Sequence, residues 1–94
     1  MITAKIDPLE ETFGSRARVK IMKLLAINEE LMISQIIKRT KLNHTSVSKH
    51  LNFLINHDLV QLKTFGRIKI YRFKTENLRA RSFIKFLNIW ENKL

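Results

Sequence analysis

The sequence contains no cysteine, which excludes disulfide bonds, zinc fingers and thiol catalysis. With only two glycines and one proline in 94 residues, it is expected to have short loops and mostly regular secondary structure. No apolar run approaches the roughly 20 residues that cross a bilayer, and the N-terminus, MITAKIDPLEE, has no apolar signal core. We therefore expect a soluble cytoplasmic protein with no membrane partner.

Acidic residues are scarce in the middle of the chain. Between Leu31 and Lys74 lie nine Lys and Arg side chains and one acidic residue, Asp58, which gives this segment a net charge of +8. The segment before it has five basic and five acidic residues, and the segment 76–94 has four basic and two acidic. Charge confined to one structural unit indicates a surface for a polyanion, and duplex nucleic acid is the polyanion with a matching shape.

Changes in hydrophobic period divide the chain into helices and one hairpin. Apolar residues recur at helical spacing up to about His57 and again after Lys74, and the period between them is two, with Gly66 at the turn. We expect Asp58 in the left-handed conformation that ends a helix. The chain is thus expected to be one domain, 1–94, that is mainly α with a small β-hairpin (α+β). The expected helices, with capping residues in parentheses, are 8 to about 13 (Asp7), 16–28 (Ser15), 44–57 (Asn43) and about 76–93 (Thr75 or Asn77). A further short helix, with Ser34 as its expected cap, is expected to end at a tight turn formed by residues 40–43.

Two helices joined by a tight turn and followed by a hairpin describe a winged helix-turn-helix. Three segments resemble the ArsR-type family of prokaryotic transcriptional regulators, with MarR-type proteins close behind: FGSRARVKIMKLL (13–25), LNHTSVSKHLNFLINHDLV (42–60) and FGRIKIYRFK (65–74). The middle segment is the most specific, because its helix-turn-helix, TSVSKHL and DLV motifs fall in register. The resemblance implies a core at 13–74 and a homodimer that binds palindromic operator DNA, usually as a repressor.

The sequence departs from the family pattern at three positions. Arg16, Ile37 and Lys41 stand where a proline, a small residue and a glycine are common. The helix before the turn, MISQIIKRT, also lacks the cysteines with which the family senses metals. We therefore expect neither a cofactor nor a bound metal.

The expected recognition helix, 44–57, has short polar residues in its first two turns. Val47, Leu51, Leu54 and Ile55 point inward, and the rotation of about 100° per residue directs the polar side chains outward into a major groove. The expected base contacts are Thr45, Ser46, Lys49 and Asn52, and the expected backbone contacts are Lys38, Lys41, His44, Ser48 and His50.

The expected wing is a basic loop at 63–69. Lys63, Arg67 and Lys69 surround Gly66, and such a loop can lie along the DNA backbone or place an Arg in a narrow minor groove. The three histidines lie on or beside the recognition helix without an acidic partner, so we interpret them as surface or phosphate-facing residues and not as metal ligands.

The last helix has more apolar residues than one core face requires. Such a surplus usually marks an interface, although one wide core face of a monomer is the alternative. We expect N- and C-terminal dimerisation helices, and the interface residues are expected to be Ile6, Leu9, Phe83, Phe86, Leu87 and Trp90.

The sequence as a whole predicts a sequence-specific double-stranded DNA-binding regulator, a homodimeric repressor of a palindromic operator. No glycine-rich phosphate loop or catalytic triad indicates an enzyme. A nonspecific architectural DNA-binding protein and a protein-interaction module are the alternatives. The polar residues Thr45, Ser46 and Asn52 argue against the first, and the charge of the 31–74 segment argues against the second.

Overall fold

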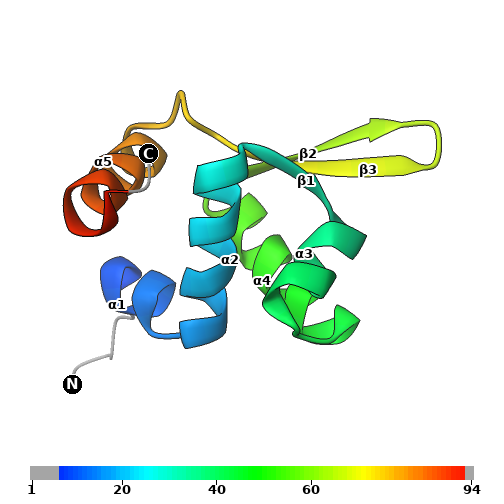
Figure 1. Cartoon of the computed structure of the whole chain (residues 1–94), viewed down its shortest axis with the longest axis horizontal. Helices are drawn as coiled ribbons and strands as arrows, with labels where there is room; N and C mark the ends of the chain where they lie inside the picture. The colour runs from blue at the N-terminus through cyan, green and yellow to red at the C-terminus, as the bar shows by residue number, and fades with distance from the viewer. Residues whose placement is uncertain (1–6, 93–94) are drawn as a thin grey trace, which may run out of the picture.

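The computed structural model describes residues 7–92 of the chain. Helices make up most of it, and the strands form one three-stranded antiparallel sheet (Figure 1). This arrangement confirms the expected mainly α fold with a small β component. The elements in chain order are α1 (Pro8–Phe13), α2 (Arg16–Asn28), β1 (Glu30–Met32), α3 (Ile33–Thr40), α4 (His44–Asn56), β2 (Val60–Phe65), β3 (Ile68–Phe73) and α5 (Leu78–Glu91).

Several helices begin at the capping residues expected from the sequence. The side chains of Asp7, Ser15, Asn43 and Asn77 accept hydrogen bonds from backbone N–H groups in the first turns of α1, α2, α4 and α5. Such caps satisfy donors that have no partner within the helix. Of the two candidates considered for α5, Asn77 is the cap, so this helix starts at Leu78.

The start of α3 differs from the expectation. Ser34 lies inside the helix, and Met32 occupies the capping position, where its backbone N–H donates to Oε1 of Gln35 at 2.8 Å. The reason is β1, which runs directly into α3 without a loop. A strand of three residues is too short to show an alternating pattern, so periodicity does not predict it.

The sheet has the strand order β1-β3-β2. β1 pairs with β3 opposite residues 70–72, whereas β2 pairs with β3 as far as Phe65 and Ile68 at the turn. The outer part of β2 and β3 is therefore a two-stranded ribbon, and it projects away from the helices (Figure 1). This ribbon is the wing.

Non-glycine residues adopt left-handed backbone conformations at the end of α3 and just after the end of α4. Asp58 has φ 62°, which confirms the sequence expectation for this position. Lys41 has φ 61°, and its N–H donates to the carbonyl of Ile37 at 2.9 Å to end α3. A side chain in this region costs roughly 1–2 kcal/mol relative to glycine. The turn between α3 and α4 therefore carries strain at a lysine.

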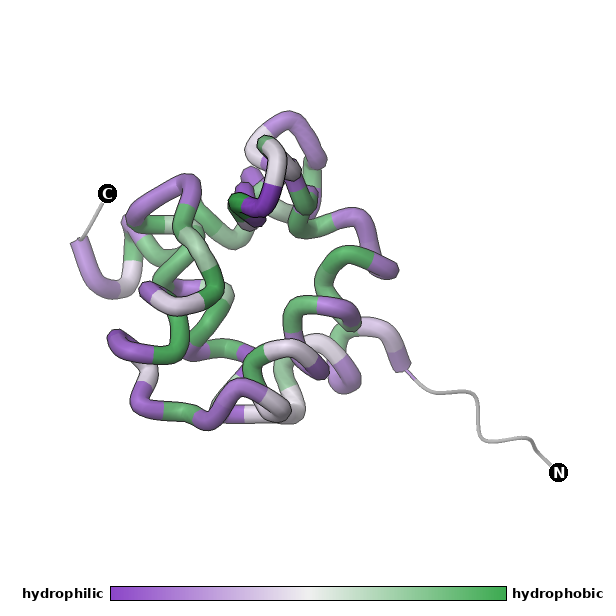
Figure 2. Tube along the Cα trace, turned by 90° about the vertical axis from the view of Figure 1, so that its right-hand side faces the viewer, coloured by the Kyte–Doolittle hydropathy of each residue, from purple (hydrophilic) through white to green (hydrophobic). Residues whose placement is uncertain are grey.

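The hydrophobic core surrounds α2, which contacts α1, α3, α4 and α5 and lies in the middle of the molecule (Figure 1). Hydrophobic and hydrophilic stretches alternate along the helices, as an amphipathic pattern requires (Figure 2). The large side chains that are fully buried are Ile21, Met22, Leu25, Ile36, Val47, Leu51, Leu54, Val60 and Phe73.

Three residues of α5 belong to this core, Ala80, Phe83 and Leu87, and the last two were expected at an interface. Phe83 and Leu87 are buried in the core cluster, and the ring of Phe83 lies 6.0 Å from that of Phe73. The expectation that Phe83 and Leu87 form a dimer interface is wrong, because they cover the chain's own core. None of the helices between residues 7 and 92 has the length and apolar composition that spanning a bilayer requires.

Candidate nucleic-acid interface

The outward face of α4 carries the polar residues expected to contact bases. Thr45, Lys49 and Asn52 are exposed, and Ser46 is half-buried. The opposite face is fixed in the core by Val47, Leu51 and Leu54, none of which is accessible to solvent. The Oδ1 of Asn43 accepts from the N–H of Ser46 at 2.7 Å and so holds the first turn of α4. The geometry thus places the four candidate base contacts on the side of α4 that faces away from the core.

The candidate backbone contacts lie beside this face. Lys38 and Lys41 are exposed at the end of α3 and in the turn that leads to α4. His44 is exposed, and its Nδ1 lies 3.4 Å from the Oγ of half-buried Ser48 one turn later. These four side chains remain available to solvent, as a phosphate contact requires.

His50 is not on this surface. Only 8% of it is exposed, so the expectation that it faces phosphates is wrong. It follows Val47 by three positions and precedes Leu54 by four, which places it on the inward face of α4. Burial lowers the pKa of His50 below its ordinary value of 6.5, and the charges of Arg18 and Lys49 lower it further. Among the described residues, none offers a hydrogen-bond partner to its Nδ1.

Arg18 of α2 is buried as well, although a charged side chain is ordinarily expected at the surface. Its guanidinium carbon lies 3.6 Å from the centre of the Phe53 ring on α4, and its Nη1 donates to the carbonyl of Glu11 on α1. Phe53 stacks on His57 with ring centres 3.9 Å apart, and Nε2 of His57 lies 3.8 Å from the Glu11 carboxylate. This cluster ties the end of α4 to α1 and α2. The sequence does contain a signal for the burial of Arg18, because residues 18, 21, 22 and 25 share one face of α2.

The wing carries exposed cations at its tip. Gly66 has φ 62°, as the sequence required of the hairpin turn, and Arg67 and Lys69 are exposed beside it. Lys63 differs, because its Nζ lies 3.2 Å from the Glu30 carboxylate of β1. Of the three candidate wing contacts, Arg67 and Lys69 therefore face solvent most openly.

At the base of the wing, two other cations of the basic segment form ion pairs with acidic side chains. Arg72 bonds Glu76 at 2.7 Å, and this hydrogen bond is the main cause that lowers the pKa of Glu76 to about 2. Lys74 bonds Asp58, and with Asn77 it lowers the pKa of that carboxyl. The exposed cations of the segment are consequently concentrated on α3, α4 and the wing tip: Lys38, Arg39, Lys41, Lys49, Arg67 and Lys69.

Comparison with known proteins agrees with this geometry. Residues 15–61 match a family model, which is described as "Bacterial regulatory protein, arsR family". The matched segment contains α2, α3 and α4 with the turn between the last two.

The chain belongs to the ArsR family. It is 30% identical over 84 residues to an uncharacterised HTH-type transcriptional regulator of Methanocaldococcus jannaschii, a match that covers 89% of this chain and 92% of that protein. The structure is similar to the transcriptional repressor PagR of Bacillus anthracis, with a TM-score of 0.71, 29% identity and coverage of 85% and 88% of the two chains. It also resembles HlyU from Vibrio cholerae N16961, with a TM-score of 0.75, 20% identity and coverage of 89% and 88%.

Membership of the ArsR family makes the chain a transcriptional regulator with a DNA-binding helix-turn-helix fold, and not an enzyme. The family's sensing cysteines are missing from the sequence. In the portion from residue 7 to residue 92, no three His, Asp or Glu side chains gather closely enough to hold a metal ion.

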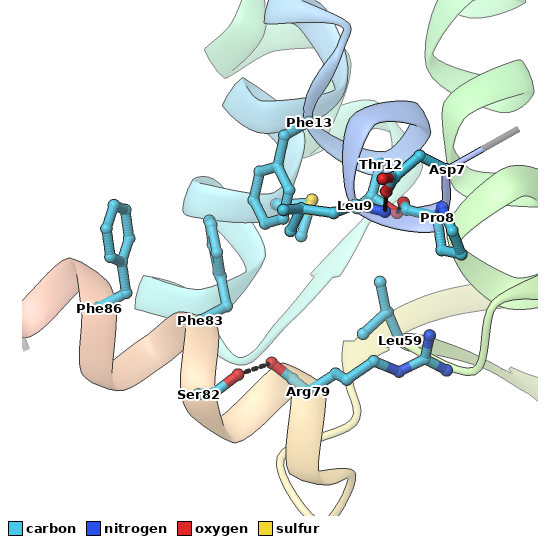
Figure 3. Close-up of a pocket in the computed structure, with 11 residues that line it drawn as sticks. Asp7, Pro8, Leu9, Thr12, Phe13, Leu59, Arg79, Ser82, Phe83 and Phe86 are labelled. Carbon is cyan, nitrogen blue, oxygen red and sulfur yellow. Dashed lines mark hydrogen bonds between the residues drawn. The ribbon is translucent and has the colours of Figure 1, made fainter.

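A second feature of this ArsR-family chain is an apolar groove between α1 and α5. The groove has a volume of about 820 Å³, and Figure 3 shows Leu9 and Phe13 of α1 opposite Phe83 and Phe86 of α5. The rings of Phe13 and Phe83 are 5.7 Å apart. Ile6, the other candidate interface residue on this side, lies outside the described residues.

The outer side of α5 extends the apolar surface of the groove. Phe86 is 50% exposed, Ile89 75% and Trp90 73%, and Leu9 of α1 is 67% exposed. The rings of Phe86 and Trp90 pack 5.7 Å apart at the end of α5. Large apolar side chains that gather on one face of a small protein usually mark an interface.

Proposed function

We propose that this protein is a homodimeric repressor that binds a palindromic operator sequence-specifically. Helix α4 enters the major groove, and the wing, residues 63–69, lies on the flanking backbone or minor groove. The observation that carries the proposal is the polar outward face of α4, on which Thr45, Lys49 and Asn52 are exposed, together with the exposed cations on α3 and on the wing. A reading helix flanked by phosphate-binding groups is the arrangement that helix-turn-helix proteins use.

Each candidate base contact has a chemical preference. Lys49 reaches the O6 and N7 acceptors of guanine, and the amide of Asn52 suits the N6 and N7 groups of adenine. The methyl group of Thr45 packs against a thymine methyl, and the Ser46 hydroxyl donates or accepts. Lys38, Lys41, His44 and Ser48 contact phosphates and fix the orientation of the helix without reading sequence.

The homodimer is supported by the apolar surface on α1 and α5. Burial of Leu9, Phe86, Ile89 and Trp90 against the same face of a second copy removes from water the large apolar side chains that this face exposes. Trp90 is the natural anchor, because tryptophan is enriched at the energetic centres of interfaces. The similarity to a protein described as a transcriptional repressor, PagR, supports repression.

Binding of duplex DNA without sequence preference is the second candidate, since the same cations would serve an architectural protein. Polar side chains on the outward face of α4 favour the specific reading, because nonspecific binding needs only phosphate contacts.

A binding titration at two salt concentrations distinguishes these functions. The duplexes are one selected by the protein from a random pool and one of scrambled sequence. Contacts to on the order of 6–10 phosphates by a dimer predict a log–log salt slope of about −5 to −9 on both duplexes. The selected duplex should bind at least about 10³-fold more tightly.

The Lys49→Ala variant is the matched probe of base reading. Loss of one bidentate base contact per subunit should relax preference at one position in each half-site by about 1–3 kcal/mol, while the salt slope changes little. Equal affinity for selected and scrambled duplexes would establish the architectural function instead. A salt slope shallower than about −2 would leave DNA binding by the basic surface without support.

A further inference from the structure

The tip of the wing is apolar. Phe65 is 59% exposed and Ile68 is 51% exposed, although both lie within the basic segment of the chain. They are cross-strand partners, the last pair of β2 and β3 before the turn. Directly opposed residues of an antiparallel pair point to the same face, so the two side chains form one apolar unit at the end of the ribbon.

The geometry of the turn directs this unit outward. The two residues between Phe65 and Ile68 are Gly66, at φ 62°, and Arg67, which is not among the residues with positive φ. A glycine with positive φ at the first turn position is typical of a tight two-residue hairpin whose twist matches its strands. Because β1 pairs only with residues 70–72, the tip extends beyond the three-stranded part of the sheet (Figure 1).

Cations lie next to the apolar unit on the ribbon, although Lys69, the cross-strand partner of Thr64, is on the opposite face. Arg67 lies in the turn, Lys69 follows Ile68 and is exposed, and Nζ of Lys63 is 5.9 Å from the centre of the Phe65 ring. A hydrophobic tip with flanking positive charge is complementary to a groove that has an apolar floor and a row of negative charges along each edge. The DNA minor groove, with its stacked bases behind the phosphates, is such a groove.

We propose that Phe65, supported by Ile68, is a wedge that enters the minor groove beside each half-site and partly unstacks one base step. This inference rests on the proposed DNA-binding function and adds to it a deformation of the DNA. Insertion of an apolar side chain between base steps kinks a duplex toward the major groove by roughly 20–90°. Arg67 and Lys69 then hold the phosphates on either side of the opened step.

A wedge gives the wing its own sequence preference. Pyrimidine–purine steps such as TA and CA unstack more easily than others, so the protein should prefer them at the flanks without a hydrogen bond to any base there. The wedge would thus contribute specificity at positions that α4 does not reach.

The test uses 2-aminopurine, a base whose fluorescence rises when it is unstacked. Duplexes selected by the 94-residue chain carry one 2-aminopurine at successive flanking positions, and donor and acceptor dyes on the duplex ends report bending. Saturating protein should raise the fluorescence at one step in each flank by at least about twofold and shorten the end-to-end distance. Phe65→Leu should retain both signals, because leucine can also act as a wedge.

Two variants separate the wedge from the charge. Phe65→Thr and Ile68→Thr keep a residue that favours strands, and circular dichroism verifies that each variant folds. At saturation both should lose most of the fluorescence rise. Arg67→Ala is the matched control, since it should weaken binding yet leave the rise intact once the DNA is saturated.

Binding without any fluorescence rise at the flanks would overturn the wedge and leave the proposed function standing. Failure of the protein to bind any duplex would overturn both. Adsorption to phosphatidylserine vesicles that Phe65→Thr abolishes, together with unperturbed base stacking, would reassign the tip to an anionic membrane surface and equally overturn the wedge.

Discussion

At the scale of single residues, Lys41 combines a conformational cost with a proposed contact. Its φ of 61° disfavours any residue with a Cβ, and its exposed side chain is a candidate phosphate contact. Lys41→Gly should therefore stabilise the free protein by about 1 kcal/mol. The same change should weaken DNA binding and lower the magnitude of the salt slope by about one per subunit. Chemical denaturation and a salt titration measure the two effects on one variant.

Lys41→Ala is the control for this prediction. Alanine removes the charge but keeps a Cβ in the left-handed conformation, so it should weaken DNA binding without the gain in stability. Equal free energies of unfolding for the alanine and glycine variants would contradict the argument from backbone strain.

His50 should make stability depend on pH in a narrow range. Its folded pKa lies below the ordinary value of 6.5, so the unfolded chain takes up a proton first as pH falls. Stability is therefore complete above about pH 6.5 and should decline below it, by at most about 1.4 kcal/mol per pH unit. The carboxyl groups with lowered pKa values, Asp58 and Glu76, have ordinary values of 3.8 and 4.5 and titrate below this range.

The measurement compares denaturation of the parent and His50→Gln between about pH 7.5 and pH 5.5. The difference between the two curves isolates His50 from the other histidines. The parent should lose stability relative to the variant as the pH decreases. Parallel curves would show that His50 does not titrate differently in the folded and unfolded chain.

His50 and Arg18 also show where residue identity misleads a sequence interpretation. Both are polar or charged, a residue type ordinarily expected at the surface, yet both lie at helical spacing from buried apolar neighbours. For Arg18, a stacked ring and a backbone carbonyl compensate burial of the charge. Such compensation depends on Phe53 of α4 and Glu11 of α1, which only the packing of the helices brings to Arg18, so periodicity predicts the burial but residue type does not.

At the scale of elements, the outer face of α5 should hold the dimer together. Trp90→Ala removes the largest exposed apolar side chain of α5 without touching the core, so it should raise the dimer dissociation constant by about 30-fold or more, equivalent to roughly 2 kcal/mol. The helical circular dichroism of the variant should remain unchanged. Sedimentation equilibrium at several protein concentrations provides the measurement.

Leu87→Ala on the same helix is the matched control. Leu87 lies in the core, so its truncation should lower the free energy of unfolding by about 2–5 kcal/mol. If the parent is monomeric at tens of micromolar, or if Trp90→Ala dimerises as tightly as the parent, the interface lies elsewhere.

Elements with strong local signals could be predicted, whereas those made by distant contacts could not. Asn43 and Asn77 cap their helices because a side chain a few residues away suffices. β1 exists because residues 70–72 pair with it, and no local pattern records that pairing. In the same way, an apolar stripe on α5 predicts burial, but only the fold assigns Phe83 to the core and leaves Phe86 exposed.

At the scale of the whole molecule, two copies related by a two-fold axis should bind only when the two half-sites lie a whole number of helical turns apart on the DNA. Their recognition helices would enter successive major grooves about 34–36 Å apart, on one side of the duplex. Inserting about five base pairs between half-sites should abolish tight binding, and inserting about ten should restore part of it. A band-shift titration on the three duplexes tests this expectation. Equal affinity for all three would show that the two half-sites bind independently.

The pairing of β1 with β3 has a consequence for how the chain is made. Glu30 pairs with Arg72, so β1 can pair with β3 only after 42 further residues have left the ribosome. α2, α3 and α4 lie within 41 residues of one another, 16–56, and can associate earlier, because local contacts form faster than distant ones. We therefore expect the reading helix to be assembled before the wing during synthesis. A nascent chain from which only the residues before 70 have emerged would present α4 without the wing and with the core residue Leu31 uncovered.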